Sequence, residues 1–413
     1  MRAVVLIDGD HYAPVVRDAL ATLPYEVVAA LLVGGTEKLR GGEDYGVPLV
    51  GTLDETAADV VVDLSDEPVL GPRERMLWAS RALALGLPYA GADFRFDPPP
   101  LHPVPFPSLA VIGTGKRVGK TAVATHAARL LARGRRVAVV SMGRGGPPEP
   151  ELCEAPPSVA ELVALARAGR HAASDYLETA VFAAVPTVGC RRAGGGLAGA
   201  TVDSNVLEGA ALAATLDPEL VLFDGSGAAL PPVAAGARIL VTNGGHDVRD
   251  GLNAYRVLVS DLVVDTGGAD TAAVRALKDV PVVRAELRLR PAEPLRGRRV
   301  AVFTTGRAPT EHLDAEVVHV SRNLADRAAL RAELAGIDAE VYLVELKAAA
   351  IDVVAEAALE RGAELVLAAN AIVSEELDAH VAALVREVAR RSRRLDGGDP
   401  VAEPAAWPAA ERG

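Results

Sequence analysis

Short runs of apolar, often β-branched residues alternate along this chain with stretches in which apolar residues recur every three or four positions. The runs are typical of buried strands, and the stretches are typical of helices packed on one face. The N-terminal residues 1–97 contain the expected strands Ala3–Ile7, Val27–Val33 and Val60–Leu64 and the expected helices Val15–Leu23 and Arg73–Leu85. This alternation predicts a small doubly wound α/β unit.

Two proline-containing breaks interrupt the pattern further along the chain. Residues 98–107 are rich in proline, which can neither continue a helix nor pair in a central strand, so they predict a stiff linker. A second break lies at Arg290–Pro294. Between the breaks the expected strands are Ser108–Ile112, Arg136–Ser141, Leu220–Phe223, Arg238–Thr242 and Leu262–Asp265, and after the second they are Arg299–Thr304, Val317–Val320, Val341–Glu345 and Leu365–Ala368.

Composition supports an α/β protein of several domains. The chain has 413 residues, of which 50% are hydrophobic and only 4% aromatic, so Val, Leu, Ala and Ile must build the core. The net charge of −12 argues against a nucleic-acid-binding protein. Cys153 and Cys190 are too few for a disulfide framework and lack metal-site spacing. The chain begins with an expected strand rather than a secretion signal, and no apolar run reaches membrane-spanning length, so we expect a soluble cytoplasmic enzyme without a membrane partner.

The strand at residues 108–112 runs into a glycine-rich loop that ends in Gly119-Lys120-Thr121 and is followed by the helix-like residues 122–131. This arrangement predicts a P-loop, in which backbone N–H groups and a helix N-terminus surround the phosphates of ATP. Lys120 is expected to reach the β- and γ-phosphates, and the Thr121 hydroxyl is expected to bind Mg²⁺. The expected ATP-binding residues are Gly113, Thr114, Gly115, Lys116, Arg117, Val118, Gly119, Lys120, Thr121 and Ala122.

Lysine is rare in this chain, which makes a second lysine in the loop informative. Two of the five lysines, Lys116 and Lys120, fall in this loop, whereas arginine supplies nearly all the other positive charge. A compact ammonium acts as a point charge on phosphate, so both lysines are candidate catalytic residues.

The second chemical motif is an acid at the end of an apolar strand, Asp224, followed by Gly225-Ser226-Gly227. A carboxylate in this place downstream of a P-loop is expected to organise Mg²⁺, so Asp224 is a candidate catalytic and metal-binding residue. The alternative is that Asp224 simply begins a turn, since Asp-Gly is a common turn pair. For the base of ATP, strand order offers only Thr266 and the segment 283–288 as candidates.

The loop Gly113–Thr121 and the segment Leu220–Gly227 are similar to the corresponding segments of the dethiobiotin synthetase branch of P-loop enzymes. A fuller resemblance is to the cyclic 2,3-diphosphoglycerate synthetase family. It is carried, in this order, by the segments Asp8–Pro14, Gly34–Leu39, Met142–Pro147, Thr187–Gly196 and Leu252–Asp261. The resemblance implies an ATP- and Mg²⁺-dependent ligase or cyclase. It would close a phosphoanhydride ring between the two phosphates of 2,3-diphosphoglycerate and release ADP and phosphate. In the dethiobiotin branch an acid after the second strand of this domain helps to hold Mg²⁺, which makes Glu149 a further metal candidate here.

A substrate with two phosphates and a carboxylate requires several cationic donors. Arg144 follows an expected strand, and Arg191 and Arg192 lie beside a glycine-rich segment that we expect to be flexible enough to fold onto an anion. In the N-terminal unit, His11 and Lys38 follow the first two strands, at the edge where doubly wound sheets bind ligands. These five residues are the candidate substrate-binding groups, and a surface role remains the alternative for each.

The sequence therefore predicts an α/β fold in which a P-loop domain with a mostly parallel sheet is flanked by two smaller α/β units. The expected bounds are 1–97 for the N-terminal unit, 98–107 for the linker, 108–292 for the P-loop domain, 293–390 for the C-terminal unit and 391–413 for a disordered tail. We expect a homodimer, in which Lys116 would act either within its own chain or across the interface. Two other functions remain open: another ATP-dependent kinase or ligase acting on a small phosphorylated or carboxylated acid, and a dimeric P-loop ATPase switch.

Overall fold

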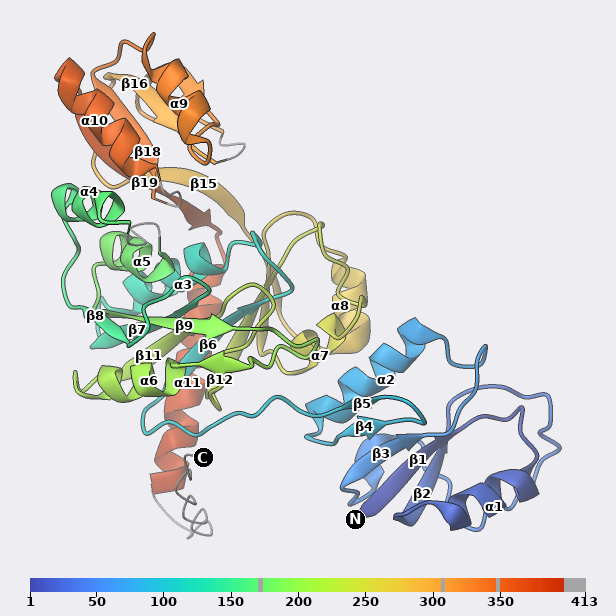
Figure 1. Cartoon of the computed structure of the whole chain (residues 1–413). Helices are drawn as coiled ribbons and strands as arrows, with labels where there is room; N and C mark the ends of the chain where they lie inside the picture. The colour runs from blue at the N-terminus through green and yellow to red at the C-terminus, as the bar shows by residue number, and fades with distance from the viewer. Residues whose placement is uncertain (170–173, 306–308, 347–349, 397–413) are drawn as a thin grey trace, which may run out of the picture.

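The computed structural model of the chain describes residues 1–169, 174–305, 309–346 and 350–396. Within these residues the strands form three sheets, each in its own lobe (Figure 1). The N-terminal lobe lies to one side of the central lobe, and most of the C-terminal lobe lies at another end of it. In the described part, no helix has the length and apolar character needed to cross a lipid bilayer.

The N-terminal lobe contains a sheet with the strand order β2-β1-β3-β4-β5. The strands are β1 (Arg2–Ile7), β2 (Glu26–Leu32), β3 (Val60–Asp63), β4 (Tyr89–Ala90) and β5 (Arg95–Phe96), and the helices are α1 (Ala13–Thr22), the short 3₁₀ helix η1 (Leu53–Glu55) and α2 (Pro72–Ala84). The first four strands in chain order pair in parallel, and β5 pairs antiparallel with β4. The predicted doubly wound unit is therefore confirmed.

The central lobe contains a sheet with the order β10-β9-β7-β11-β6-β12-β13-β14, and β8 pairs with β9. Its strands are β6 (Ser108–Gly113), β7 (Val137–Gly143), β8 (Glu151–Cys153), β9 (Thr187–Ala193), β10 (Asp203–Ser204), β11 (Leu220–Asp224), β12 (Ala237–Thr242), β13 (Leu262–Asp265) and β14 (Val282–Arg284). From β9 to β14 all neighbours are parallel, as predicted, whereas β8 and β10 are antiparallel to β9. The carboxyl ends of the parallel strands therefore share one edge.

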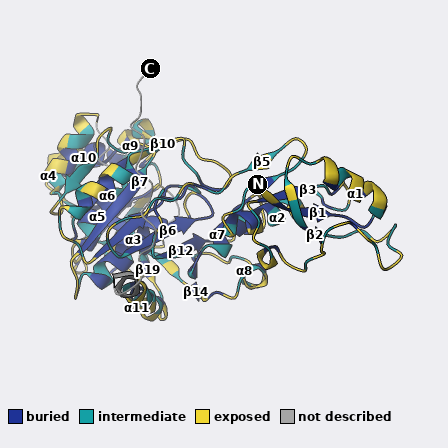
Figure 2. Cartoon of the chain, turned by 90° about the horizontal axis from the view of Figure 1, so that it is seen from below, coloured by how far each residue is buried: buried dark blue, intermediate teal, exposed yellow. Residues whose placement is uncertain are grey.

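Helices cover both faces of this sheet, and the buried residues concentrate on its strands (Figure 2). They are α3 (Lys120–Leu131), α5 (Asp175–Ala183), α6 (Val206–Ala214), α7 (Asn253–Leu258) and α8 (Thr271–Leu277), whereas α4 (Val159–Arg167) packs with the C-terminal lobe. Val123 of α3 packs with Val139 and Leu222 on one face. Ala210 of α6 and Tyr255 of α7 belong to the core on the other face. Burial on both faces explains why these strands read as continuous apolar runs.

The C-terminal lobe contains a sheet with the order β15-β19-β18-β16-β17. Its strands are β15 (Glu286–Pro291), β16 (Arg299–Phe303), β17 (Glu316–Ser321), β18 (Val341–Glu345) and β19 (Glu364–Val373), and its helices are α9 (Arg327–Leu334) and α10 (Ile351–Arg361). The strands pair in parallel except for β15, which is antiparallel to β19. This sheet therefore has the α/β character that the sequence predicts.

Two segments lie elsewhere than the sequence-based domain bounds place them. Strand β15 begins at Glu286, so the C-terminal sheet starts inside the residues assigned to the P-loop domain. The last helix, α11 (Leu377–Asp396), packs on α3 and the central sheet rather than on the C-terminal sheet, because Leu377, Val381 and Val385 join the core under α3. This helix also includes residues 391–396 of the expected tail, and 397–413 lie outside the described residues.

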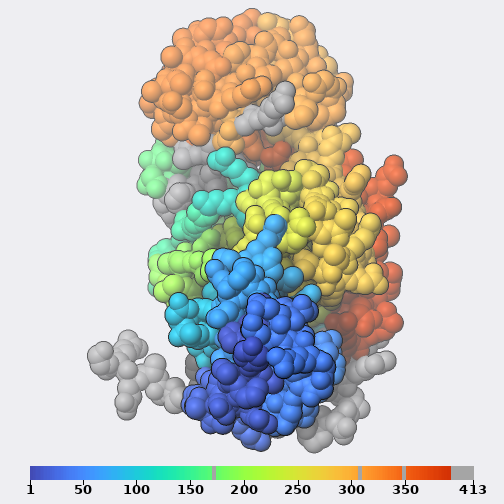
Figure 3. Space-filling model, turned by 90° about the vertical axis from the view of Figure 1, so that its right-hand side faces the viewer, coloured from blue at the N-terminus to red at the C-terminus, as the bar shows by residue number. Residues whose placement is uncertain are grey.

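The N-terminal lobe docks on the central lobe through α2, which packs against α7. One continuous set of buried apolar residues runs from Leu6 and Ala79 of the N-terminal lobe to Val257 and Phe223 of the central lobe. Figure 3 shows the N-terminal lobe in front of the central lobe, beside the part formed by residues near 250, with the C-terminal lobe at the top of the view. The linker is attached as well, because the N–H of His102 donates to the Pro232 carbonyl.

Candidate functional site

The P-loop connects the end of β6 to the start of α3. Gly119 has φ of +94°, a left-handed conformation that favours glycine, and α3 begins immediately afterwards at Lys120. The Lys120 side chain is only 8% exposed, and its ammonium donates a hydrogen bond of 2.7 Å to the Gly115 carbonyl. The lysine predicted to contact phosphate is therefore held inside the loop, at the N-terminus of a twelve-residue helix.

Two neighbouring strands hold the P-loop from behind. The N–H of Thr114 donates to the Val241 carbonyl at 3.2 Å, and its hydroxyl lies 3.1 Å from that of Thr242. The hydroxyl of Thr266, just after β13, lies 2.8 Å from the Val118 carbonyl and donates to it. Thr266, which strand order made a candidate for base recognition, thus supports the loop backbone.

The oxygen atoms predicted to hold a metal lie at the carboxyl edge of the sheet beside the start of α3. Asp224 ends β11 with 1% exposure, and the strand register places it beside Ser141 of β7. Both residues continue the alternation of Val139 and Leu222, so they lie on the face that α3 covers. The Ser141 hydroxyl is buried without a hydrogen-bond partner among the described residues, and the Thr121 hydroxyl donates to Asp175 at 3.2 Å.

These donors fit Mg²⁺ in their chemistry, since it prefers hard oxygen ligands and usually takes one or two carboxylates together with substrate phosphates. Among the described residues no three His, Cys, Asp or Glu side chains form an all-protein metal site, which agrees with such a sparse donor set. Glu149, the further metal candidate, is exposed between β7 and β8, and within the described part it has no recorded contact with Thr121 or Asp224. A role for Glu149 stays a prediction.

Arg191 and Arg192 lie in a strand, and the glycines at 194–196 follow it outside the strand. Residues Thr187–Ala193 form β9, which is fixed by β7, β8 and β10 around it. Because side chains alternate along a strand, Arg191 and Arg192 point to opposite faces. The structure therefore separates two arginines that the sequence treated as one group.

Arg192 meets Arg144 and Lys116 around Gly227, and we call these three side chains the Gly227 cluster. A Cβ atom on Gly227 would lie 3.3 Å from a guanidinium nitrogen of Arg192, 3.4 Å from one of Arg144 and 3.8 Å from Cγ of Lys116. Gly227 itself has φ of +62°, so both its backbone and its surroundings favour glycine. Lys116 thus lies beside Arg144 and Arg192 of its own chain.

The Gly227 cluster has an excess of positive charge. Burial, and secondarily the charge of Arg144, lower the pKa of Arg192, although a guanidinium remains charged near neutral pH. Arg192 donates to the Ser226 carbonyl at 2.9 Å, and its buried Nε has no partner among the described residues. Within the described residues, neither Arg144 nor Arg192 forms an ion pair with a carboxylate. Such a cluster suits a polyanion.

A cavity of about 200 Å³ connects the arginine and metal-binding regions. It opens between the loop after β7 and the start of α5, and its walls include Ser141, Arg144 and Asp175. Cys190 also lines it, but burial raises the pKa of this thiol to about 12, so it is not a nucleophile near neutral pH. The cavity therefore offers one guanidinium group, that of Arg144, and hard oxygens rather than a reactive thiol.

A second polar group lies at the carboxyl edge of the N-terminal sheet. His11 Nδ1 lies 2.7 Å from Asp8, and its Nε2 lies 3.4 Å from Asp66. The hydrogen bond to Asp8 raises the pKa of His11 despite the opposing effect of burial. Lys38 pairs with Glu37, and its ammonium lies 5.5 Å from the centre of the Tyr12 ring. His11 and Lys38 share this edge, as expected, but in the described part no contact joins them to the Gly227 cluster.

Sequence reasoning missed several residues that shape the site. Asp175 and Ser141 carried no motif, and the side chain of His246 lies against Gly115 of the P-loop. Arg256 is 2% exposed and donates to the carbonyls of Ala228 and Leu197, which fixes the loop that contains Gly227. The sequence could have identified Arg256, because it is a charged residue among mostly apolar neighbours in the short helix α7.

Three family descriptions match this chain. They are the N-terminal domain of cyclic 2,3-diphosphoglycerate synthetase over residues 2–97, its P-loop domain over 108–282 and its C-terminal domain over 291–371. A protein named cyclic 2,3-diphosphoglycerate synthetase from Rubrobacter xylanophilus is 48% identical, over 96% of this chain and 100% of its own. One of the same name from Thermococcus kodakarensis is 42% identical, over 89% and 94%.

Similarity to solved structures is weaker. The structure of LpxK from Aquifex aeolicus in complex with ATP has a TM-score of 0.43 and 16% identity, and covers 69% of this chain and 90% of its own. A likeness at this level is too distant to support an argument about the site.

Proposed function

Because the chain belongs to the cyclic 2,3-diphosphoglycerate synthetase family, we propose that its P-loop binds ATP while the Gly227 cluster holds the phosphorylated acid beside it. The enzyme is an ATP-dependent synthetase that makes cyclic 2,3-diphosphoglycerate. We assign different residues to ATP and to the phosphorylated acid because of one observation. The side chains of Lys116, Arg144 and Arg192 converge on Gly227, three residues after Asp224.

The acceptor must approach ATP although both are polyanions, and mutual repulsion is the main obstacle to their reaction. Lys120 at the start of α3 favours the γ-phosphate, and Lys116 extends from the same loop toward Arg144 and Arg192. Guanidinium groups suit phosphate because they donate in a planar fork. We assign Arg144 and Arg192 to the binding of a phosphate of 2,3-diphosphoglycerate. Arg191 points to the opposite face of β9 and contributes less to substrate binding.

The reaction proceeds by positioning and charge stabilisation, without a strong base, since phosphate is already ionised at neutral pH. An oxygen of one substrate phosphate attacks the γ-phosphorus in line, and the bond to the β-phosphate breaks to release ADP. An oxygen of the neighbouring phosphate then attacks the phosphorus that now carries the transferred group. The ring P–O–P bond forms and the former γ-phosphate leaves as inorganic phosphate, so every phosphorus and oxygen atom is accounted for.

We assign the metal to Thr121 and Asp224, with Ser141 and Asp175 beside them. When bound there, Mg²⁺ would neutralise charge on the ATP phosphates. Thr121 and Asp224 keep hard oxygens at the carboxyl edge of the sheet, and Asp175 orients the Thr121 hydroxyl. Glu149 remains a weaker candidate, because it is exposed on a different loop.

The proposed roles of His11 and Lys38, the cellular location and the assembly rest on chemical reasoning, not on contacts with the ATP-binding loop. His11 and Lys38 offer positive charge at the edge of the N-terminal sheet, where they would take the second phosphate or the carboxylate of the substrate. A cytoplasmic location suits an enzyme that consumes ATP. We retain a homodimer as the expected assembly, with Lys116 acting inside its own chain.

The experiment that tests this function is ³¹P NMR of the purified protein with ATP, Mg²⁺ and 2,3-diphosphoglycerate. Ring closure predicts paired upfield anhydride resonances that grow together with ADP and inorganic phosphate. If ATP binds but no such resonances appear, while another phosphorylated or carboxylated acid supports ADP formation, the acceptor assignment is overturned.

A further inference from the structure

The loop between β12 and α7, residues 243–252, contacts the P-loop through one side chain, His246. A Cβ atom built on Gly115 would lie 2.5 Å from both Cε1 and Nε2 of the His246 imidazole. The three atoms nearest to that position all belong to this ring. A side chain at position 115 would therefore require the His246 ring to move.

Gly115 also contacts the lysine that serves the γ-phosphate. Its carbonyl accepts the 2.7 Å hydrogen bond from Lys120. The same short stretch of backbone thus has an imidazole packed against it and the P-loop ammonium bound to it. A displacement of His246 would change the position of the backbone from which Lys120 takes its orientation.

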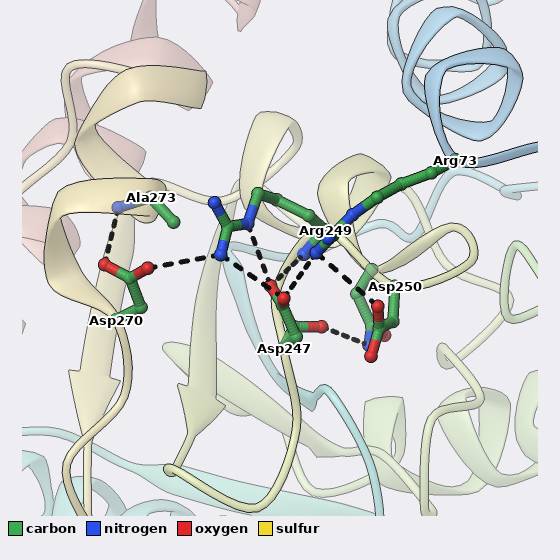
Figure 4. Close-up of polar contacts among 7 residues, drawn as sticks. Arg73, Asp247, Arg249, Asp250, Asp270 and Ala273 are labelled. Atoms are coloured by element: carbon green, nitrogen blue, oxygen red, sulfur yellow. Dashed lines mark hydrogen bonds and ion pairs between the residues drawn. The ribbon is translucent and has the colours of Figure 1, made fainter. Parts of the chain in front are cut away.

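The residue after His246 is bound to the N-terminal lobe (Figure 4). Arg73, in the first turn of α2, pairs with Asp247 and lies 3.7 Å from Asp250. Arg249 pairs with Asp247 at 3.1 Å and with Asp270 at 3.3 Å. Asp270 caps α8 by accepting from the N–H of Ala273 at 2.9 Å. His246 is therefore carried by a loop that is anchored both to the central lobe and to the N-terminal lobe.

The chain that leads to Arg73 begins at the polar edge of the N-terminal sheet. Asp8, which binds His11, also accepts a hydrogen bond of 2.9 Å from the N–H of Asp66. Residues 64–71 then run directly into α2 and Arg73. The segment that follows β3 and the loop that follows β12 thus meet at the ion pair between Arg73 and Asp247.

We propose that His246 is a positioning residue for the ATP-binding loop, and that the Arg73–Asp247 ion pair from the N-terminal lobe holds it in place. His246 acts on Gly115 by ring packing, and docking of the N-terminal lobe sets how closely the ring approaches. This inference rests on the proposed role of Lys120 toward ATP. Val248 and Leu252 bury the base of the loop in the core that the two lobes share, and the ion pairs of Asp247 hold the part of the loop beside His246.

Steric complementation between positions 115 and 246 tests this packing directly. Gly115→Ala is expected to lower kcat/KM for ATP at least about a hundredfold, because the new methyl group would overlap the imidazole. His246→Ala should raise KM for ATP about tenfold and leave KM for 2,3-diphosphoglycerate within about twofold. The double variant should recover at least about tenfold over Gly115→Ala, whereas His246→Phe, which keeps a ring, should stay near the wild type.

The coupling to the N-terminal lobe is tested in the same assay. Arg73→Ala should raise KM for ATP several-fold, and combining it with His246→Ala should add little, because both act through one contact. Arg95→Ala, which removes an exposed ion pair within the N-terminal lobe, is the matched control and should change neither constant. Equal melting temperatures would exclude a loss of folding as the cause.

The inference would be overturned if the double variant recovered no activity over Gly115→Ala and His246→Ala kept the wild-type KM for ATP. If Gly115→Ala did not fold, a wild-type KM for ATP in His246→Ala would be enough to overturn it. Additive effects of Arg73→Ala and His246→Ala would overturn the link to the N-terminal lobe. Failure of the proposed function would instead be seen as turnover that persists in Lys120→Ala, a variant that leaves the packing of His246 intact.

Discussion

The ammonium group of Lys120 donates a hydrogen bond of 2.7 Å to the carbonyl oxygen of Gly115 within the same loop. The bond holds a nearly buried cation at the N-terminus of α3, where we propose that the phosphates of ATP bind. Orientation of this charge before the substrates meet is what electrostatic catalysis of phosphoryl transfer requires.

Lys120→Ala should therefore lower kcat roughly a thousandfold while the fold is retained, since it removes a preorganised cation rather than a core side chain. The measurement is ADP release at saturating ATP and 2,3-diphosphoglycerate. Lys278→Ala is the matched control, because this lysine binds the carbonyls of Leu258 and Ser260 away from the loop. Turnover above a tenth of the wild-type rate in Lys120→Ala would contradict the assignment.

Asp224→Asn should raise the Mg²⁺ concentration that gives half-maximal activity, by about tenfold or more, because a neutral amide replaces a metal-binding carboxylate. Titration of activity with Mg²⁺ at fixed ATP measures the shift. Glu219→Gln, just before the other end of the same strand, provides a matched change of charge and should leave the titration unchanged. An unshifted Mg²⁺ dependence in Asp224→Asn would remove Asp224 from the metal site.

The affinity for 2,3-diphosphoglycerate should depend on the protonation of His11. The hydrogen bond to Asp8 raises its pKa above the ordinary 6.5, so its positive charge, and any binding it contributes, is fully present below that value. This contribution is lost as the pH rises through the raised pKa. KM for 2,3-diphosphoglycerate measured across this range should show the loss in the wild type but not in His11→Gln.

Asp8→Asn should move the same step to lower pH, because the carboxylate that stabilises the charged imidazole is gone. The substrate phosphates also titrate, but they affect KM equally in the wild type, His11→Gln and Asp8→Asn. Their effect therefore cancels when the three pH profiles are compared. Identical pH profiles for the wild type and His11→Gln would exclude His11 from substrate binding.

Arg256→Met should destabilise the protein by about 3 kcal/mol, because one buried and two part-buried carbonyl groups lose a donor. Chemical denaturation monitors the free energy of unfolding. Arg136→Met removes contacts of a largely exposed arginine and should change that free energy by less than about 0.5 kcal/mol. Equal stabilities of the two variants would show that Arg256 does not support the Gly227 loop.

The fold was largely predictable because its strands are buried on both faces and read as apolar runs. The P-loop was also readable, since its strand, loop and helix are consecutive. Strand β9 was not, because Gly189 and its two arginines resemble a polar loop; only pairing with β7 and β8 makes this segment extended. The packing of α11 on the P-loop domain was equally hidden, since an apolar helix face does not specify which core it joins.

The place of a candidate residue in the fold was predictable where it belonged to a local motif, as for Lys120, Thr121 and Asp224, and their roles stay predictions. His246 and Asp175 lie far along the chain from Gly115 and Thr121, and only the folded sheet brings each pair together. Strand alternation also decides between Arg191 and Arg192, and it could be applied only once β9 was known to be a strand. Long-range contacts of this kind leave no signal in local sequence.

The central claim is that Arg144 and Arg192 hold the acceptor beside the ATP cradle, and KM for 2,3-diphosphoglycerate in the Arg144→Ala, Arg192→Ala double variant tests it most directly. Loss of two charge-assisted contacts predicts an increase of roughly a hundredfold, with KM for ATP within about threefold of the wild type. Arg191→Ala, on the opposite face of β9, should give a smaller increase. An unchanged KM for 2,3-diphosphoglycerate in the double variant would contradict the account.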